Sequence, residues 1–122
     1  MIGYTTLGTN DIKRAAKFYD ALLEEFGAKR AMETDKLILW GTGPGQPMLS
    51  VIKPFDGKAA TVGNGVMVAL AAKNKAQVDA IYNKAIQLGG KDEGKPGNRG
   101  DGFYAGYFRD LDGNKLNAFF MG

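Results

Sequence analysis

Apolar and polar residues follow two similar series along the chain, and each series predicts the same order of elements. In the first, an alternating stretch over residues 2–9 predicts a strand, and Asn10 and Asp11 predict a helix start. Apolar residues then recur at three- and four-residue spacing up to Gly27, which predicts a helix with the inward positions Ile12, Ala15, Ala16, Tyr19, Leu22, Leu23 and Phe26. Three short strands are expected next, over residues 28–33, 36–41 and 48–53.

The second series begins with an apolar run over residues 65–70, which predicts another first strand. Asn74 is a good helix cap, and Gly89 and Gly90 end a helix whose inward positions are Val78, Ile81, Tyr82, Ala85 and Leu88. A weak strand is expected over residues 90–93, followed by strands over 103–109 and 115–121. The turn between the last two contains Asp110, Asp112 and Asn114, whose side chains are expected to bond local backbone.

The two series predict a single α+β domain built from paired βαβββ modules. Module one covers about residues 1–53, a linker about 54–63, and module two about 64–122. Each module alone would leave much apolar surface uncovered, so we expect the pair to pack as one unit.

Composition narrows the class of protein without naming a function. Hydrophobic residues make up 44% and charged residues 24% of the 122 positions, which is typical of a soluble globular domain. No apolar run is long enough for a membrane span, and no secretory signal is visible, so we expect a cytoplasmic protein. The net charge of +3 is spread along the chain, which predicts no nucleic-acid and no membrane partner but is compatible with an anionic small ligand.

The chain contains neither histidine nor cysteine. A cysteine nucleophile and an imidazole base are therefore excluded, as is a disulfide framework. Hard oxygen atoms are the remaining candidates for metal ligands.

Three segments carry a resemblance to a known family: residues 7–15 together with 18–20, residues 65–70, and residues 107–116. In these segments the chain resembles the vicinal oxygen chelate superfamily, which contains glyoxalases, bleomycin-resistance proteins and extradiol dioxygenases. The resemblance implies paired modules whose sheets curve into a cup around a ligand cavity. It also implies a homodimer.

Metal-dependent members of that family take their ligands from the first and last strand of each module. Carried onto this sequence, these positions hold Tyr4, Ser50, Met67 and Asn117. None is a histidine or a carboxylate, and a thioether, two hydroxyls and an amide suit no single divalent ion. We therefore expect no metal and no other cofactor, and we expect these four residues to line the ligand cavity.

Four further residues are candidates for the cavity. Trp40, Tyr104 and Phe119 lie on expected strands, where an aromatic side chain is more often core than ligand contact. By strand alternation, Phe119 shares the face of Asn117, whereas Leu116, Ala118 and Phe120 point the other way. Arg99 lies in a glycine-rich stretch over residues 93–102, expected as a loop at the mouth of the cup, where it could reach an anionic group.

The sequence supports three functions. The first is metal-independent binding of a small organic molecule in the cup. The second is a lyase or isomerase of the glyoxalase type, in which Tyr4 acts as acid or base; this would need a strongly depressed phenol pKa. The third is a structural or regulatory module whose cup is filled by its own side chains.

Overall fold

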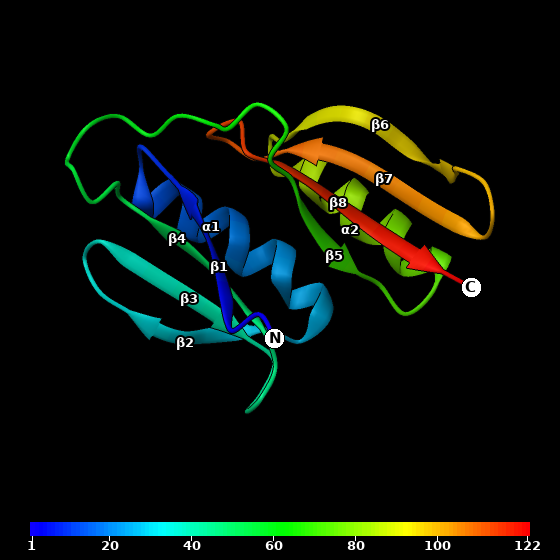
Figure 1. The fold of residues 1–122 in the computed structure, drawn as a ribbon, viewed down its shortest axis with the longest axis horizontal. Helices are drawn as coiled ribbons and strands as arrows, with labels where there is room; N and C mark the ends of the chain where they lie inside the picture. The colour runs from blue at the N-terminus through cyan, green and yellow to red at the C-terminus, as the bar shows by residue number, and fades with distance from the viewer. The chain divides into compact units, whose positions relative to one another are not determined.

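The structure is a computed structural model that describes residues 1–122. It is an α+β fold of eight strands and two α-helices, as the sequence predicts, with a short 3₁₀ helix in addition (Figure 1). The chain forms two compact units, Met1–Val62 (unit 1) and Gly63–Gly122 (unit 2). No helix combines the length and the apolar character needed to cross a membrane.

Unit 1 contains one helix and a four-stranded sheet in the order β1-β4-β3-β2. Its elements are β1 (Tyr4–Gly8), α1 (Ile12–Leu23), the 3₁₀ helix η1 (Glu24–Phe26), β2 (Lys29–Glu33), β3 (Leu37–Gly41) and β4 (Met48–Ile52). The outer strand β1 pairs in parallel with β4, and the other pairs are antiparallel. This register places Thr6 beside Ser50.

The ends of α1 follow the signals in the sequence. The Asp11 carboxylate accepts a hydrogen bond of 3.0 Å from the backbone N–H of Arg14, which satisfies one of the free donors of the first turn. The helix ends at Leu23 and tightens into η1, and Gly27 then reverses the chain with a φ of 74°. Of the predicted inward positions, Ala15, Ala16, Tyr19, Leu22 and Leu23 are buried. Ile12 and Phe26 at the two ends are only half-buried, and Phe18, which was not predicted, is buried as well.

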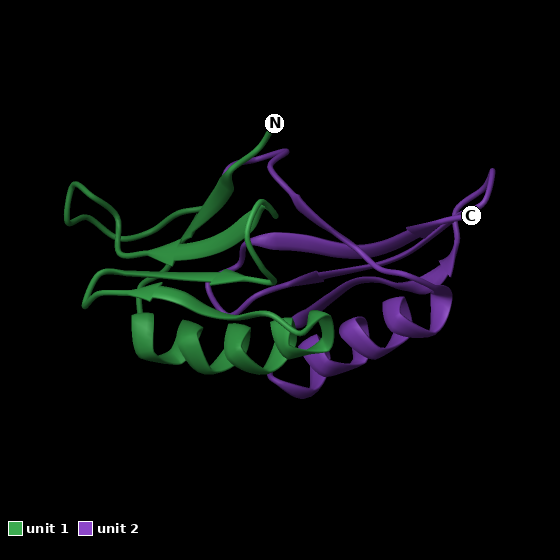
Figure 2. Cartoon of the chain, turned by 90° about the horizontal axis from the view of Figure 1, so that it is seen from below, with its two compact units in different colours: residues 1–62 green, residues 63–122 purple.

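Unit 2 repeats the plan, with the sheet order β5-β8-β7-β6. Its elements are β5 (Val68–Ala71), α2 (Lys75–Gln87), β6 (Lys91–Asn98), β7 (Phe103–Arg109) and β8 (Lys115–Met121). The Asn74 side chain caps α2 by accepting a hydrogen bond of 2.8 Å from the backbone N–H of Gln77. Each unit carries its helix along one face of its own sheet (Figure 2).

Two elements of unit 2 differ from the sequence prediction. The first strand begins at Val68, so Met67 lies just before it. The strand expected over residues 90–93 runs to Asn98, so the predicted loop over 93–102 shrinks to a turn after the strand. Strand β7 offers a long pairing edge, and register shifts between Asp92 and Gly97 let the glycine- and proline-containing segment pair with it.

The turn between β7 and β8 confirms the predicted local bonding. Asp110 is buried, and its Oδ1 atom accepts hydrogen bonds of 2.9 Å from the backbone N–H groups of Asp112 and Asn114. The Asn114 side-chain amide donates to Oδ2 of the same carboxylate, also at 2.9 Å. These bonds fix the hairpin that sets the β7–β8 register.

Candidate functional site

Each sheet has one face covered by its helix and an opposite face, which we call the helix-free face. Trp40 marks the helix-covered face of unit 1, because its indole N–H donates to Asp20 of α1 at 2.8 Å. Tyr104 marks the same face of unit 2, because its hydroxyl donates to Asp79 of α2 at 2.6 Å. Since strand side chains alternate, their strand neighbours belong to the helix-free faces.

The helix-free face of unit 1 includes Tyr4 and Ser50, two of the predicted cavity residues. Tyr4 and Thr6 alternate along β1, and in the register they lie beside Met48 and Ser50 of β4. Ser50 is fully buried, and its hydroxyl donates a hydrogen bond of 2.7 Å to Oγ1 of Thr6. Tyr4 is 58% exposed, so its ring is accessible. This face therefore offers hydroxyl groups and an aromatic surface.

The helix-free face of unit 2 is built around Asn117 of β8. In the register, Asn117 lies between Ala69 of β5 and Tyr107 of β7. Its side chain is only 1% exposed, and its Oδ1 atom is buried without a hydrogen-bond partner. An acceptor buried without a donor typically destabilises a fold by about 1–3 kcal/mol, so such a group needs an explanation. Met67 precedes β5 and is exposed.

Aromatic rings and two cations surround this amide on the same face. Phe119, two residues beyond Asn117 as predicted, stacks on Phe103 with 5.7 Å between ring centroids. The Arg99 guanidinium and the Lys115 ammonium each lie 5.5 Å from the centroid of the Tyr107 ring. A cation at this distance is attracted to the face of the ring.

The charges on this face differ in how far they are neutralised. Arg109 pairs with Glu93 through a contact of 2.6 Å, and this hydrogen bond is the main reason that the pKa of Glu93 lies below its usual value. Lys115 adds a smaller attraction to the same carboxylate. Arg99 donates to the backbone carbonyl of Lys95 at 2.7 Å and makes no ion pair, so its charge is available to an anion.

The structure does not bring Trp40 or Tyr104 together with these residues. The Trp40 ring is buried against Tyr19 of α1, with 5.7 Å between ring centroids. Tyr104 pairs with Phe120, and strand alternation places Phe120 on the other face of β8 from Asn117. The hydrogen bond to Asp79, together with burial, raises the pKa of the Tyr104 hydroxyl. Both side chains thus bind a sheet to its helix.

Sequence reasoning missed Thr6, Tyr107 and Lys115 as members of the helix-free faces. A signal for Tyr107 was present in the sequence. The turn pairs Arg109 with Lys115, and counting two residues away from the turn along each strand pairs Tyr107 with Asn117. Thr6 depends on the parallel register of β1 with β4, which joins segments more than forty residues apart and has no local signal.

The residues at the four family metal positions do not fit a divalent ion. Tyr4 and Ser50 offer neutral hydroxyls, Met67 a soft thioether and Asn117 a neutral amide oxygen. No group of three or more Asp, Glu, His or Cys side chains could hold a metal anywhere in the chain. The four positions themselves hold no carboxylate and no imidazole, which are the metal ligands that the family resemblance implies.

Both units are βαβββ modules, which places the chain in the class of proteins built from paired modules of this kind. Residues 1–118 match the Glyoxalase/Bleomycin resistance protein/Dioxygenase superfamily, and the chain belongs to this family. It is a member that lacks the metal ligands.

Solved structures support this assignment. A glyoxalase/bleomycin resistance protein from Albidiferax ferrireducens is 34% identical, with a TM-score of 0.92 and coverage of 100% of this chain and 99% of that one. A hypothetical protein from S. aureus is 27% identical, with a TM-score of 0.75 and coverage of 98% and 92%. A lactoylglutathione lyase from Agrobacterium tumefaciens shares the fold at 23% identity, with a TM-score of 0.72 and coverage of 98% and 92%. A comparison with curated proteins finds no match.

Proposed function

We propose that this protein binds a small organic molecule without a metal, and that Asn117 is the anchor of the binding site. The observation that carries the proposal is the Oδ1 atom of Asn117, a buried acceptor without a donor. The atom is covered by protein in this conformation, so a bound molecule with an N–H or O–H group would supply the missing hydrogen bond after displacing the side chains that cover it. Each unpaired buried polar group in a folded protein needs an explanation, and an ordered water or a bound molecule is one.

The surroundings of Asn117 support a ligand with a flat apolar part. The stacked rings of Phe103 and Phe119 and the ring of Tyr107 present aromatic surface beside the amide. Ligand sites are typically apolar with a few polar groups that fix orientation, and this face has that composition. Arg99 and Lys115 favour a ligand with a negative or electron-rich group near Tyr107.

A thermal-shift screen tests the proposal, because a ligand of the native state raises the melting temperature. The screen uses glutathione and flat aromatic compounds that carry a hydrogen-bond donor, including aromatic antibiotics. We expect at least one compound to stabilise the wild type and to lose most of that effect in Asn117→Leu. Asn83→Leu, the same change at an exposed position of α2, should bind as the wild type does.

Two results would contradict the proposal. The first is a compound that binds equally well to the wild type and to Asn117→Leu. The second is turnover of the methylglyoxal–glutathione hemithioacetal upon addition of zinc, nickel or manganese, which would support a metal-dependent lyase instead.

A further inference from the structure

A pocket of about 400 Å³ lies in unit 1, beyond the carboxyl ends of the parallel strands β1 and β4. It contains none of the residues assigned to the proposed ligand site. Its lining comes from the residues that follow the two strands, from the residue before β3 and from the loop after β4: Thr9, Asn10, Lys36, Ile52, Lys53, Pro54, Phe55, Gly57, Lys58 and Ala59.

Hydrogen bonds within unit 1 hold the walls of this pocket. Beyond the strands, the backbone N–H of Thr9 donates to the Ile52 carbonyl at 3.0 Å, and that of Lys53 donates to the Lys36 carbonyl at 2.9 Å. The loop is tied back by Asn10, whose Oδ1 accepts from the Ala60 N–H at 2.6 Å and whose Nδ2 donates to the Ala60 carbonyl at 3.3 Å. The pocket is therefore formed before any ligand arrives, which lowers the entropy that binding must overcome.

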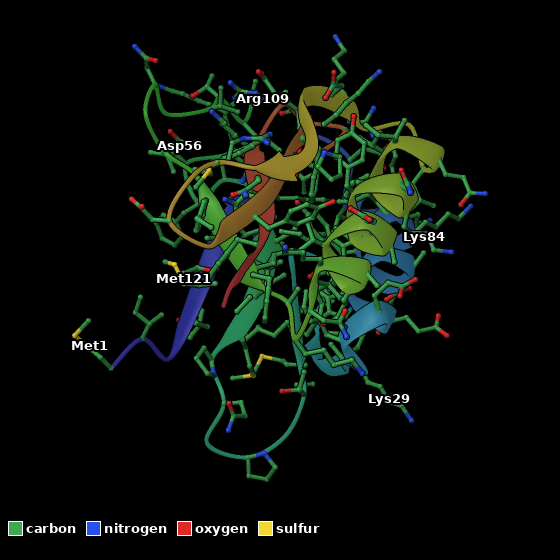
Figure 3. All side chains as sticks on the ribbon, turned by 90° about the vertical axis from the view of Figure 1, so that its right-hand side faces the viewer. Met1, Lys29, Asp56, Lys84, Arg109 and Met121 are labelled. Atoms are coloured by element: carbon green, nitrogen blue, oxygen red, sulfur yellow. The ribbon has the colours of Figure 1, made fainter.

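The charged groups that line the pocket all carry the same sign. Lys36, Lys53 and Lys58 contribute three ammonium groups, none of them is in an ion pair, and no carboxylate is among the lining residues. Asp56, labelled in Figure 3, belongs to the same loop and keeps its negative charge, but it is not among the lining residues; its carboxylate accepts a hydrogen bond of 2.9 Å from the backbone N–H of Lys58. Three cations around one concave site attract an anion and raise its local concentration.

The pocket also has an apolar wall. Phe55 is fully exposed, although it is a large aromatic residue, and Ile52 and Pro54 are partly exposed beside it in the chain. A ligand with an aromatic or aliphatic part would bury some of this surface while its charged group faces the lysines. The volume is within the range of small-molecule sites, about 300–1,000 Å³.

We propose that this pocket binds a small organic anion, a carboxylate or phosphate ester attached to an apolar group. The anionic group lies against Lys36, Lys53 and Lys58, and the apolar group lies against Phe55. The site is separate from the one proposed around Asn117, so either can fail without the other.

Amide NMR spectra of the full-length, ¹⁵N-labelled protein provide the test. The probes are phenyl phosphate, benzoate and inorganic phosphate, with benzyl alcohol as the uncharged counterpart. We expect phenyl phosphate or benzoate to give saturable shifts confined to residues 9–10, 36 and 52–60, and benzyl alcohol to give none there. Comparison of the two aromatic anions decides between phosphate and carboxylate, and inorganic phosphate should bind more weakly than phenyl phosphate.

Variants locate the two parts of the ligand. Lys36→Gln/Lys53→Gln should weaken binding of the aromatic anion by about tenfold, because each lysine contributes up to about a fivefold effect. Phe55→Ala should weaken the binding of phenyl phosphate and leave the binding of inorganic phosphate unchanged. Lys84→Gln, on α2 of unit 2 (Figure 3), should bind as the wild type does.

Other results would overturn the proposal. These are shifts spread over lysines of both units, the same affinity in the double variant as in the wild type, or no saturation with any probe. If the double variant does not fold, Lys58→Gln replaces it, because Lys58 lies in an exposed loop and its substitution leaves the strand ends intact.

Discussion

Asn117 and Asn114 are two buried amides that differ at the residue scale in how their side chains are hydrogen-bonded. They lie three positions apart, and both are buried. The Asn114 side chain donates to the buried carboxylate of Asp110, whereas the acceptor atom of Asn117 has no partner. Removing the side-chain amide should therefore have opposite effects on stability at the two positions.

We expect Asn117→Leu to raise the free energy of unfolding by about 1–2 kcal/mol, because it removes an unsatisfied buried acceptor. Asn114→Leu should lower the free energy of unfolding by about 1–3 kcal/mol, because it takes a donor from a buried carboxylate. Urea unfolding measures both, and a destabilised Asn117→Leu would mean that its amide is satisfied in the folded protein.

At the scale of elements, a few polar contacts join each helix to its sheet. In unit 1, Asp20 of α1 accepts from the Trp40 indole of β3 and from two nitrogens of the Arg30 guanidinium of β2, at 2.7–2.9 Å. In unit 2, Tyr82 of α2 donates to Asp92 of β6 at 2.8 Å. These contacts tie each helix to strands that follow it in the chain, and each makes stability depend on pH.

Asp20→Asn should destabilise the protein by about 1 kcal/mol at neutral pH. The Arg30 hydrogen bond holds the pKa of the Asp20 carboxyl below its usual value of 3.8, and the Trp40 hydrogen bond adds to this. A lowered pKa contributes stability above pH 3.8 that is lost as the pH falls through the folded-state pKa, so the gap between the wild type and the variant should close in acid.

The effect is small because the Asp20 carboxylate is partly exposed and water screens its charge. Denaturant unfolding at several pH values measures the difference in the free energy of unfolding between the wild type and Asp20→Asn. Asp35→Asn, at an exposed position before β3, is the control for removal of one carboxylate charge.

Tyr82→Phe gives the matching experiment at alkaline pH. Burial, followed by the hydrogen bond to Asp92, raises the pKa of Tyr82 from 10.0 to about 12. The unfolded chain therefore releases this proton first, and the wild type should lose stability between pH 10 and 12. Tyr82→Phe should lack that loss and be about 1 kcal/mol less stable at neutral pH. A spectrophotometric titration of the wild type should show a phenol that titrates with a pKa near 12, and this titration should be missing in Tyr82→Phe. If the titration persists in the variant, it belongs to another tyrosine.

At the scale of the whole molecule, the chain keeps the family fold without the family's metal donors. Zinc, nickel or manganese should therefore leave the melting temperature unchanged, as should EDTA, because an ion that bound the native state would raise it. A rise of several degrees with any of these ions would contradict the reading of Tyr4, Ser50, Met67 and Asn117. The homodimer implied by the family resemblance stays a prediction, which sedimentation velocity measures.

Local sequence signals predicted most of the fold. The helix caps Asp11 and Asn74 and the stop at Gly27 are contacts within a few residues, so the chain determines them without its tertiary partners. The hairpin turn at Asp110 is local in the same sense. Strand β6 was underestimated because its glycines and its proline disfavour a strand, and only the long pairing edge of β7 makes it one.

The candidate sites depended on pairing between distant segments. Strand alternation by itself predicted that Phe119 shares the face of Asn117. The positions of Trp40 and Tyr104 depend on which face of each sheet its helix covers, and both lie on the covered face, in contact with α1 and α2. The pocket gathers three cations from two segments, with Lys36 before β3 and Lys53 and Lys58 in the loop after β4, and their spacing along the chain gives no sign of it.

The sequence by itself thus determined the two βαβββ series, the family and the loss of its metal donors, because these depend on residue types and local spacing. Only the tertiary structure decided that the Asn117 acceptor is buried without a partner and that Arg99 and Lys115 share the ring of Tyr107. Burial and hydrogen bonding are properties of packed strands, and they are established only when the register brings distant residues side by side.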